Sequence, residues 1–194
     1  MCCIVLMGIK HCGKSTQGRL LAEKLGVPFF DTDKIIEDET GMTAREIYAT
    51  SGEESFKKAE VQACASVAEK IKVGDDNLSS VTAVIATGGG ICNNTNAIDV
   101  LRPLGKFVFL VAQEKTAADR IIREAKVSDD GKITNLPAYI AKKNPATMDD
   151  VRALFHEFYE ERVSIYSKLA DVCVRMDNAP KYVNMQRILA ASKF

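Results

Sequence analysis

The chain has 194 residues, which is enough for one α/β domain of ordinary size and too few for two large ones. Its 26 basic and 26 acidic residues give a formal net charge of +0, without the basic excess typical of nucleic-acid-binding proteins. No apolar run is long enough to span a bilayer, so we expect neither nucleic acid nor a membrane as a partner. Six cysteines without a C-x-x-C pair predict reduced thiols in a cytoplasmic protein, and the lack of a large apolar surplus favours a monomer.

Residues 8–16 fit the phosphate-binding loop pattern G-x-x-x-x-G-K-[ST]. An apolar run at 2–7 predicts a buried strand before the loop, and leucines at helical spacing predict a helix over 16–25 after it. Glycines at both ends of the loop let successive backbone N–H groups point at phosphate oxygens. Lys14 can reach the outer phosphates, and the Ser15 hydroxyl can ligate Mg²⁺. The predicted nucleotide-binding residues of the loop are Gly8, Lys10, His11, Cys12, Gly13, Lys14, Ser15 and Thr16.

Residues 27–33 predict a second strand that ends in two acids, Asp31 and Asp33, before a short helix over 34–40. Open α/β sheets place their chemistry at the carboxyl ends of strands. One carboxylate could therefore serve a metal and the other a substrate hydroxyl. The alternative is a solvated turn or a helix cap, and the spacing of the acids leaves both interpretations open.

A capping box is expected where Thr43 precedes Glu46, and Gly52 is expected to end the helix that begins there. Residues 53–72 form a long amphipathic pattern with apolar side chains on one side. Lys57 lies near its start. A lysine on a helix is most often a solvated surface charge, so this position by itself indicates no function.

A third strand is predicted at 81–86 after a polar loop at 73–80, and it runs directly into residues 87–90, which contain three consecutive glycines. Three glycines after a buried strand indicate a ligand that approaches the backbone closely. Residues 127–145 lack a clear period, as expected for a lid. The remaining predicted elements are strands at 106–111 and 170–176 and helices at 93–101, 116–126, 149–169 and 181–191. This alternation of strands and helices predicts a parallel sheet with helices on both faces.

Four further segments, taken in order with the phosphate loop, resemble motifs of the shikimate kinase family. Residues 30–33 resemble its F-D-x-D, residues 52–60 its G-E-x-x-F-R-x-x-E, residues 87–90 the triple-glycine segment that replaces a Walker B acid, and residues 162–166 its R-x-P-L-Y. The resemblance covers nearly the whole chain. It implies a P-loop NTPase fold of the nucleoside-monophosphate-kinase type, which is a three-layer α/β sandwich around a central parallel sheet.

The resemblance also implies one kinase domain over residues 1–194, with a substrate-binding helical segment at about 34–60 and a lid at about 124–150. The implied activity is the ATP-dependent phosphorylation of a small hydroxylated carboxylic acid, shikimate in the first place, with Mg²⁺ as cofactor. Asp33 would hold the substrate's hydroxyls and accept a proton, and Lys14 would neutralise developing charge. The implied ligands are Ser15 and Asp31 for the metal, Arg123 for the nucleotide, and Asp33, Lys57, Gly88, Gly89, Gly90 and Arg162 for the substrate.

Three positions depart from the family pattern. The family usually has arginine where this chain has Lys57, and lysine offers a carboxylate a point charge in place of a planar two-point contact. The arginine–proline pair of the family's lid is Leu136-Pro137 here, so that cation is missing. His11 stands where the family has glycine, and could add a pH-dependent charge or be a tolerated loop side chain. The candidate replacements for the lid cation are Lys132, Lys142 and Lys143.

These departures keep two other hypotheses open. The chain could be a related phosphate-loop kinase that acts on gluconate or on a nucleotide. It could also be a nucleotide-binding regulatory module without turnover, although such a module has no chemical need for Asp33.

Overall fold

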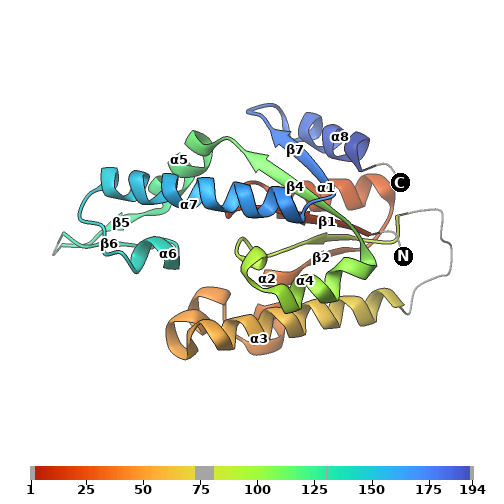
Figure 1. The fold of residues 1–194 in the computed structure, drawn as a ribbon, viewed down its shortest axis with the longest axis horizontal. Coiled ribbons are helices and arrows are strands. Elements are labelled where there is room, and N and C mark those ends of the chain that lie inside the picture. The colour runs from red at the N-terminus through yellow and green to blue at the C-terminus, as the bar shows by residue number, and fades with distance from the viewer. Residues whose placement is uncertain (1–2, 73–80, 130, 193–194) are drawn as a thin grey trace.

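The computed structural model describes residues 3–72, 81–129 and 131–192 (Figure 1). At its centre lies a parallel sheet of five strands in the order β2-β3-β1-β4-β7. The strands are β1 (Cys3–Met7), β2 (Phe29–Asp31), β3 (Val84–Ala86), β4 (Gly105–Ala112) and β7 (Val172–Met176). Val5 in the middle of β1 pairs with Ile85 on one side and Phe107 on the other. Every residue of β1 is buried, as expected for a central parallel strand that helices cover on both faces.

Helices flank the sheet, which confirms the predicted α/β fold class (Figure 1). Helices α1 and α8 pack side by side against it, α7 crosses β4, and α3 packs against α4 and α2. The helices are α1 (Lys14–Leu25), α2 (Thr32–Thr40), α3 (Ala44–Lys72), α4 (Thr95–Leu101), α5 (Glu114–Glu124), α6 (Ala138–Ala141), α7 (Met148–Leu169) and α8 (Lys181–Ala191), with short 3₁₀ turns η1 (Ile91–Asn93) and η2 (Arg102–Leu104). Within the described ranges, no helix has the length and apolar content needed to cross a membrane.

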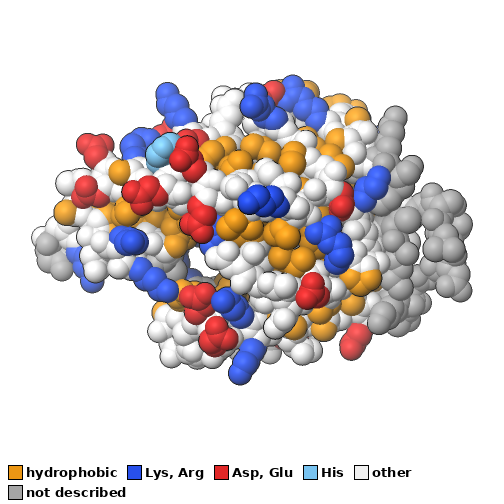
Figure 2. Space-filling model, in the orientation of Figure 1, with side chains coloured by type: hydrophobic (Ala, Val, Ile, Leu, Met, Phe, Trp, Pro, Cys, Tyr) orange, Lys and Arg blue, Asp and Glu red, His pale blue; other side chains and the backbone are white. Residues whose placement is uncertain are grey.

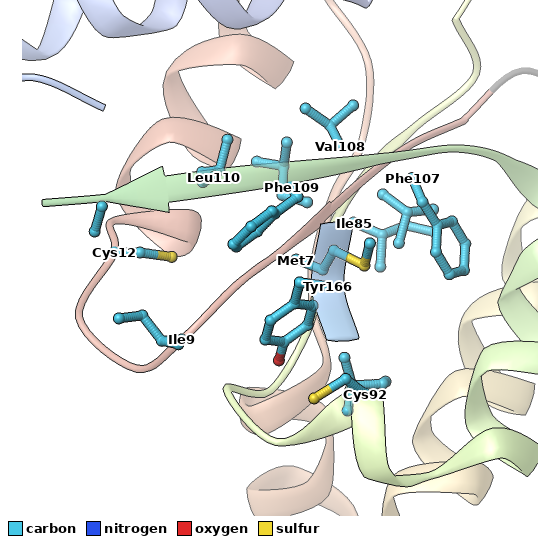
Figure 3. Packing of buried hydrophobic residues seen from close by; sticks show 14 of the residues in the cluster. Met7, Ile9, Cys12, Ile85, Cys92, Phe107, Val108, Phe109, Leu110 and Tyr166 are labelled. Atoms are coloured by element: carbon cyan, nitrogen blue, oxygen red, sulfur yellow. The ribbon is translucent and has the colours of Figure 1, made fainter. Parts of the chain in front are cut away.

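The core between β4 and α7 is aromatic. The rings of Phe109 and Tyr166 stack with their centroids 5.1 Å apart. Figure 3 shows them packed among buried side chains from β1 and from the loop that follows it. Tyr166 is fully buried, and its hydroxyl donates a hydrogen bond of 3.1 Å to the carbonyl oxygen of Gly89. This contact ties the glycine segment after β3 to the core, at the carboxyl edge of the sheet.

The second strand is shorter than predicted. Strand β2 ends at Asp31 and α2 begins at Thr32, so Asp33 lies in the first turn of a helix and not on an extended chain. The buried hydroxyl of Thr32 accepts a hydrogen bond of 3.1 Å from the Gly88 N–H, which holds the start of α2 against the glycine segment. The prediction of a strand through residue 33 was wrong because this tertiary contact is invisible in the local pattern.

The break predicted at Gly52 is confirmed. Gly52 has φ 82° and ψ 178°, a conformation that only glycine adopts readily, and it divides α3 into two helical parts. The predicted capping box is also present, because the Thr43 N–H donates to a Glu46 carboxylate oxygen at 2.7 Å and the Glu46 N–H to the Thr43 hydroxyl at 3.3 Å. These features bring the first part of α3 over the carboxyl edge of the sheet.

The segment predicted as a lid contains little regular structure. A short antiparallel pair, β5 (Lys126–Val127) and β6 (Ile133–Thr134), is followed by the single turn of α6. Figure 1 shows this segment at the end of the molecule opposite both termini, where the arrow of β4 points. The loop predicted at residues 73–80 lies outside the described residues.

Candidate active site

The phosphate loop connects β1 to α1, as predicted. Gly8 has φ 146° and Gly13 has φ 98°. A Cβ atom on Gly8 would lie 2.9 Å from both Cys12 Sγ and the Leu110 carbonyl oxygen, so this glycine is also required by packing. The buried Lys14 Nζ donates to the carbonyl oxygens of Gly8 at 2.8 Å and Ile9 at 2.9 Å, which holds the ammonium across the loop.

We call the space within this loop the phosphate cavity. It has a volume of about 250 Å³. Its lining residues are Lys10, His11, Gly13, Lys14, Ser15, Thr16, Asp33, Thr87 and Gly89. Two lysines and the N-terminus of α1 give it a positive character, which suits a polyphosphate.

His11 takes a backbone conformation that favours glycine, with φ 66°. Arg120 donates a hydrogen bond to its carbonyl oxygen, and its Nε2 lies 3.4 Å from a Glu124 carboxylate oxygen. Burial lowers the pKa of His11 below 6.5, against the opposing effect of Glu124. Burial therefore favours the neutral imidazole of His11 at this position.

A second space, the nucleotide cavity, lies on the other side of the phosphate loop and has a volume of about 220 Å³. Its walls come from the loop and α1, from α5, and from the segment between β7 and α8. Its lining residues include Thr16, Gln113, Thr116, Arg120, Asn178, Ala179 and Lys181. Arg120 lines this cavity, whereas Arg123, one turn further along α5, is exposed and does not. A nucleotide contact of Arg123 stays a prediction.

The acids at the end of β2 meet the phosphate loop in a shared space that we call the bridging cavity. Ser15, Asp31 and Asp33 all line it, together with Lys10 and Arg45. A hydroxyl and two carboxylates are the hard oxygen donors that Mg²⁺ prefers. Within the described ranges no cluster of three or more acids, histidines or cysteines could hold a metal ion by itself. This donor set therefore fits a magnesium ion that keeps several water and phosphate ligands.

The acceptor cavity lies between the phosphate loop, the first part of α3, the lid segment and α7, and has a volume of about 250 Å³. Its lining residues are Lys10, Asp33, Ala44, Arg45, Tyr48, Phe56, Gly89, Gly90, Pro137, Tyr139, Phe158 and Arg162. Aromatic rings form one wall, where Tyr139 stacks on Phe158 at 3.5 Å between ring centroids. A carboxylate and three basic side chains line the cavity together with these rings, so it suits a small hydroxylated anion with an apolar side.

Arg162 is the buried cation of the acceptor cavity, with 8% of its surface exposed. Its Nη1 donates to Cys92 Sγ at 2.7 Å, and its guanidinium lies 4.6 Å from the centre of the Phe158 ring. Its buried Nε has no hydrogen-bond partner among the described residues. Because the guanidinium also lines the acceptor cavity, it places a positive charge beside a ligand there, which suits a carboxylate.

Lys57 lies in an adjoining space, the outer cavity, which shares Tyr48, Phe56, Tyr139 and Arg162 with the acceptor cavity. Figure 2 shows the surface hollowed between the lid side of the molecule and α3, where this cavity opens. The Lys57 Nζ lies 3.1 Å from a Glu53 carboxylate oxygen, and this hydrogen bond raises the pKa of the lysine. The two cavities together bring Lys57 and Arg162 to one space, and a substrate contact of Lys57 stays a prediction.

We expect Lys57→Ala to raise KM for the acceptor much more than it lowers kcat, because such a contact is made in ground and transition states alike. Loss of a charge-assisted contact should reduce kcat/KM by roughly 10- to 150-fold. Lys57→Arg should leave activity equal or better, since arginine offers a two-point contact. Steady-state kinetics with exposed Lys58→Ala as control measures both. An unchanged KM in Lys57→Ala would remove Lys57 from the site.

Two of the three glycines after β3 are packed closely against other parts of the protein, Gly88 against side-chain ends and Gly89 against backbone. A Cβ on Gly88 would lie 2.8 Å from an Asp33 carboxylate oxygen, and one on Gly89 would lie 2.8 Å from the Lys10 backbone nitrogen. Around Gly90 the corresponding space is open. The glycine segment lets the phosphate loop and Asp33 come close together. The close approach of a ligand to this segment stays a prediction.

Two carboxyl groups near this segment have raised pKa values. The Asp33 side chain is exposed toward the cavities that it lines. The surrounding protein atoms still desolvate its carboxyl group, which raises the pKa above 3.8, and Lys14 opposes this effect. Burial raises the pKa of Glu60 to about 7. One Glu60 oxygen accepts a hydrogen bond of 2.9 Å from Asn94, and the other has no partner among the described residues. A base with a raised pKa is a better proton acceptor, which suits Asp33 to that role.

We expect Glu60→Gln to weaken the pH dependence of the free energy of unfolding between pH 4.5 and about 7. In this window folded Glu60 holds a proton that the unfolded chain releases, so stability falls as pH rises. Glutamine cannot ionise, and the variant should gain up to about 3 kcal/mol on the wild type across the window. Urea unfolding at several pH values measures this, with exposed Glu69→Gln on the same helix as control. Parallel pH profiles for wild type and Glu60→Gln would contradict it.

The cavity residues to which the sequence assigned no role include two arginines and a tyrosine. Arg45 lines the acceptor and bridging cavities, Arg120 lines the nucleotide cavity, and Tyr139 forms part of the aromatic wall. Arg120 could have been found, because it lies one turn before the predicted Arg123 on the same helix. Arg45 carried no local signal, since its hydrogen-bond partner Asn135 is 90 residues away in the sequence.

A phosphate loop, two acids at the end of β2 and the start of α2, and a small cationic cavity beside them define a P-loop kinase of a small molecule. The profile of the shikimate kinase family matches residues 10–193. The chain therefore belongs to the shikimate kinase family, a family of ATP-dependent kinases.

Individual relatives agree with this assignment. The chain is 32% identical to a shikimate kinase of Marinomonas sp. over 98% of its length and 91% of that relative, and 30% identical to one of Aquifex aeolicus over 96% and 94%. It is 42% identical to a shikimate kinase of Symbiobacterium thermophilum, where the match spans 60% of this chain and 62% of that relative.

Solved structures agree as well. A shikimate kinase from Bacteroides thetaiotaomicron superposes with a TM-score of 0.72 and 25% identity, over 97% of both chains. The fold is also similar to that of a shikimate kinase from Acinetobacter baumannii in complex with shikimate, with a TM-score of 0.73 at 24% identity over 97% of this chain and 91% of the other.

Proposed function

We propose that this protein transfers the γ-phosphoryl group of ATP to a ring hydroxyl of shikimate. One observation carries the proposal: Asp33 lines the phosphate cavity and the acceptor cavity at once, so a single carboxylate faces both partners of the transfer. The names of the relatives support shikimate as the acceptor. The roles of the individual residues below are part of the proposal.

The transfer joins the acceptor hydroxyl oxygen to the γ-phosphorus of ATP. The bond between that phosphorus and the β,γ-bridging oxygen breaks, and its electron pair stays on ADP. The hydroxyl proton passes to the Asp33 carboxylate, which the raised pKa favours. Lys14 and the backbone N–H groups of residues 8–13 stabilise the negative charge on the phosphate oxygens.

The bridging cavity is the proposed magnesium site. Ser15 and Asp31 would hold the ion, Ser15 directly and Asp31 through water, with Asp33 close by. Bound there, the ion would neutralise charge on the phosphate chain. The protein's part is to present these oxygens beside the phosphate loop.

The acceptor cavity supports a carboxylate-bearing ring. The positive charge of Arg162, which lines the cavity, suits the carboxylate, and the stacked rings of Tyr139 and Phe158 suit one apolar side of the ring. The backbone of Gly89 and Gly90, which line the cavity, would contact the hydroxylated side, whereas Gly88 does not line it and its substrate contact stays a prediction from the family resemblance. A nucleobase would leave the buried Arg162 without an anionic partner, which favours a polyhydroxy acid.

A coupled assay of ADP release with Mg-ATP tests the proposal, with shikimate, gluconate and a nucleoside monophosphate as acceptors. We expect turnover with shikimate alone. Turnover with gluconate or the nucleotide but not with shikimate would establish a different acceptor, and ATP binding without turnover of any acceptor would establish a regulatory module. We further propose a cytoplasmic monomer, which light scattering of the purified protein tests for its mass.

A further inference from the structure

The arginine that the family's lid carries has no counterpart at its position in this structure. Leu136 stands there and is buried in the core, with 4% of its surface exposed. Lys142 and Lys143 line the outer cavity and not the phosphate, bridging or acceptor cavities. The Lys142 ammonium donates a hydrogen bond to the Tyr48 hydroxyl and lies 3.8 Å from a Glu53 carboxylate oxygen. Lys142 and Lys143 therefore lie outside the three cavities in which we place the phosphoryl transfer.

Another lysine occupies the centre of the site. Lys10 lines the phosphate, bridging and acceptor cavities, a property that it shares with Asp33. Its backbone is pressed against Gly89, where an added Cβ would meet the Lys10 nitrogen at 2.8 Å and its Cα at 3.1 Å. The loop thus holds Lys10 at the junction between nucleotide and acceptor, on the path that the phosphoryl group must take.

Arg45 approaches the same junction from α3. It lines the bridging and acceptor cavities and donates a hydrogen bond to the Asn135 side chain in the lid segment. The Asn135 amide in turn donates to the Glu124 carbonyl oxygen at 2.6 Å. Arg45 is therefore joined to the chain directly before Leu136, so that its charge lies beside the place from which the lid arginine is missing.

We propose that Lys10, supported by Arg45, supplies the cation that stabilises the transferred phosphoryl group, in place of an arginine from the lid. The inference deepens the proposed kinase function and rests on it. The ion pairs among the described residues do not include Lys10. Glu124 and Asp33 attract its ammonium at longer range, which leaves it able to meet phosphate oxygens. The mutual repulsion of Lys10, Lys14 and Arg45 is relieved when an anionic phosphoryl group comes between them.

Lys10→Met tests the contact, because it keeps the length of the side chain and removes the charge. We expect kcat to fall about 100-fold, as for the loss of one charge-stabilising donor. Affinity for Mg-ADP with aluminium fluoride, a mimic of the transferred group, should fall by a similar factor, while affinity for Mg-ADP alone changes less than about threefold. Lys10→Arg should retain most of kcat and most of the affinity for Mg-ADP with aluminium fluoride. Lys24→Met, at the exposed far end of α1, serves as the matched control.

A test of Arg45 must separate the effect of its charge from the effect of its hydrogen bond to Asn135, which ties α3 to the lid segment. Arg45→Ala removes the charge and the Asn135 contact together. Asn135→Gly keeps the charge and removes that contact along with the Asn135–Glu124 hydrogen bond, and glycine tolerates the backbone conformation, since Asn135 has φ 60°. We expect kcat to fall about 10-fold in Arg45→Ala and less than about threefold in Asn135→Gly. Equal losses in the two variants would show a tether and overturn the assignment of charge to Arg45.

The affinity measurement with aluminium fluoride is made without and with shikimate, so it does not depend on the acceptor being right. Unchanged affinity in Lys10→Met, or an equal loss for Mg-ADP alone, would overturn the inference about Lys10. Failure of the wild type to phosphorylate shikimate would instead overturn the proposed function. The affinities of wild type and Lys10→Met for Mg-ADP with aluminium fluoride would still test the role of Lys10.

Discussion

Asp33→Asn is expected to lower kcat by about 10²- to 10⁴-fold while the affinity for Mg-ATP stays within a few-fold of the wild type. Asparagine keeps the size and the hydrogen-bonding capacity of the side chain but cannot accept the proton of the attacking hydroxyl. Because Asp33 lines both the phosphate and the acceptor cavity, its loss should appear in the chemical step. Single-turnover kinetics, with ATP binding followed separately, distinguish the two effects.

The dependence of kcat/KM on pH tests the role of Asp33 in a second way. Desolvation raises the pKa of Asp33, so the wild type should lose kcat/KM as pH falls through that raised value and the base becomes protonated. The Asn variant should lack this limb. Asp38→Asn on the same helix, outside the cavities and paired with Lys34 at 2.9 Å, is the matched control. Residual activity in Asp33→Asn with an unaltered acid limb would assign the base to another group.

Gly89→Ala should reduce kcat/KM by about 10²-fold, because displacing the phosphate loop by a fraction of an ångström misaligns nucleotide and acceptor. The added Cβ would lie 2.8 Å from the Lys10 backbone nitrogen, and the contacted atoms belong to the main chain, which cannot swing aside. The Tyr166 hydroxyl also holds the Gly89 carbonyl at 3.1 Å, so the glycine segment cannot retreat freely. Kinetics and isothermal titration with Mg-ADP measure the loss.

Gly90→Ala controls for the effect of a methyl group on the segment itself. A Cβ there meets no atom within 4 Å, so the melting temperature should stay at the wild-type value, whereas Gly89→Ala should lower both melting temperature and Mg-ADP affinity. If Gly89→Ala binds Mg-ADP like the wild type, a methyl group at this position does not displace the phosphate loop, and the close contact between the glycine segment and the loop is dispensable.

Much of the site could be predicted because its signals are local. The phosphate loop is a run of nine residues whose glycines and lysine act through their own backbone and side chain, and the structure places Lys14 and Ser15 as expected. Gly52 and the Thr43 capping box likewise determine helix ends through atoms a few residues apart. The order of strands and helices follows from apolar periods in the same way, which is why the fold class was correct.

Other features were decided only by tertiary packing. The start of α2 at Thr32, and with it the position of Asp33 on a helix, depends on a hydrogen bond to Gly88, 56 residues away in the sequence. The raised pKa of Glu60 comes from burial that its amphipathic helix does not reveal.

The sequence by itself determined the chemistry available to this protein: a phosphate loop, two acids after a strand, a glycine segment and a late arginine. Which side chains share a cavity was decided by the fold, because charges act over a few ångströms in space and not along the chain. Lys10 and Arg45 meet Asp33 only because β1, α3 and the start of α2 converge at one edge of the sheet. Lys57 points from the same helix as Glu53, and that helix places it in the adjoining cavity.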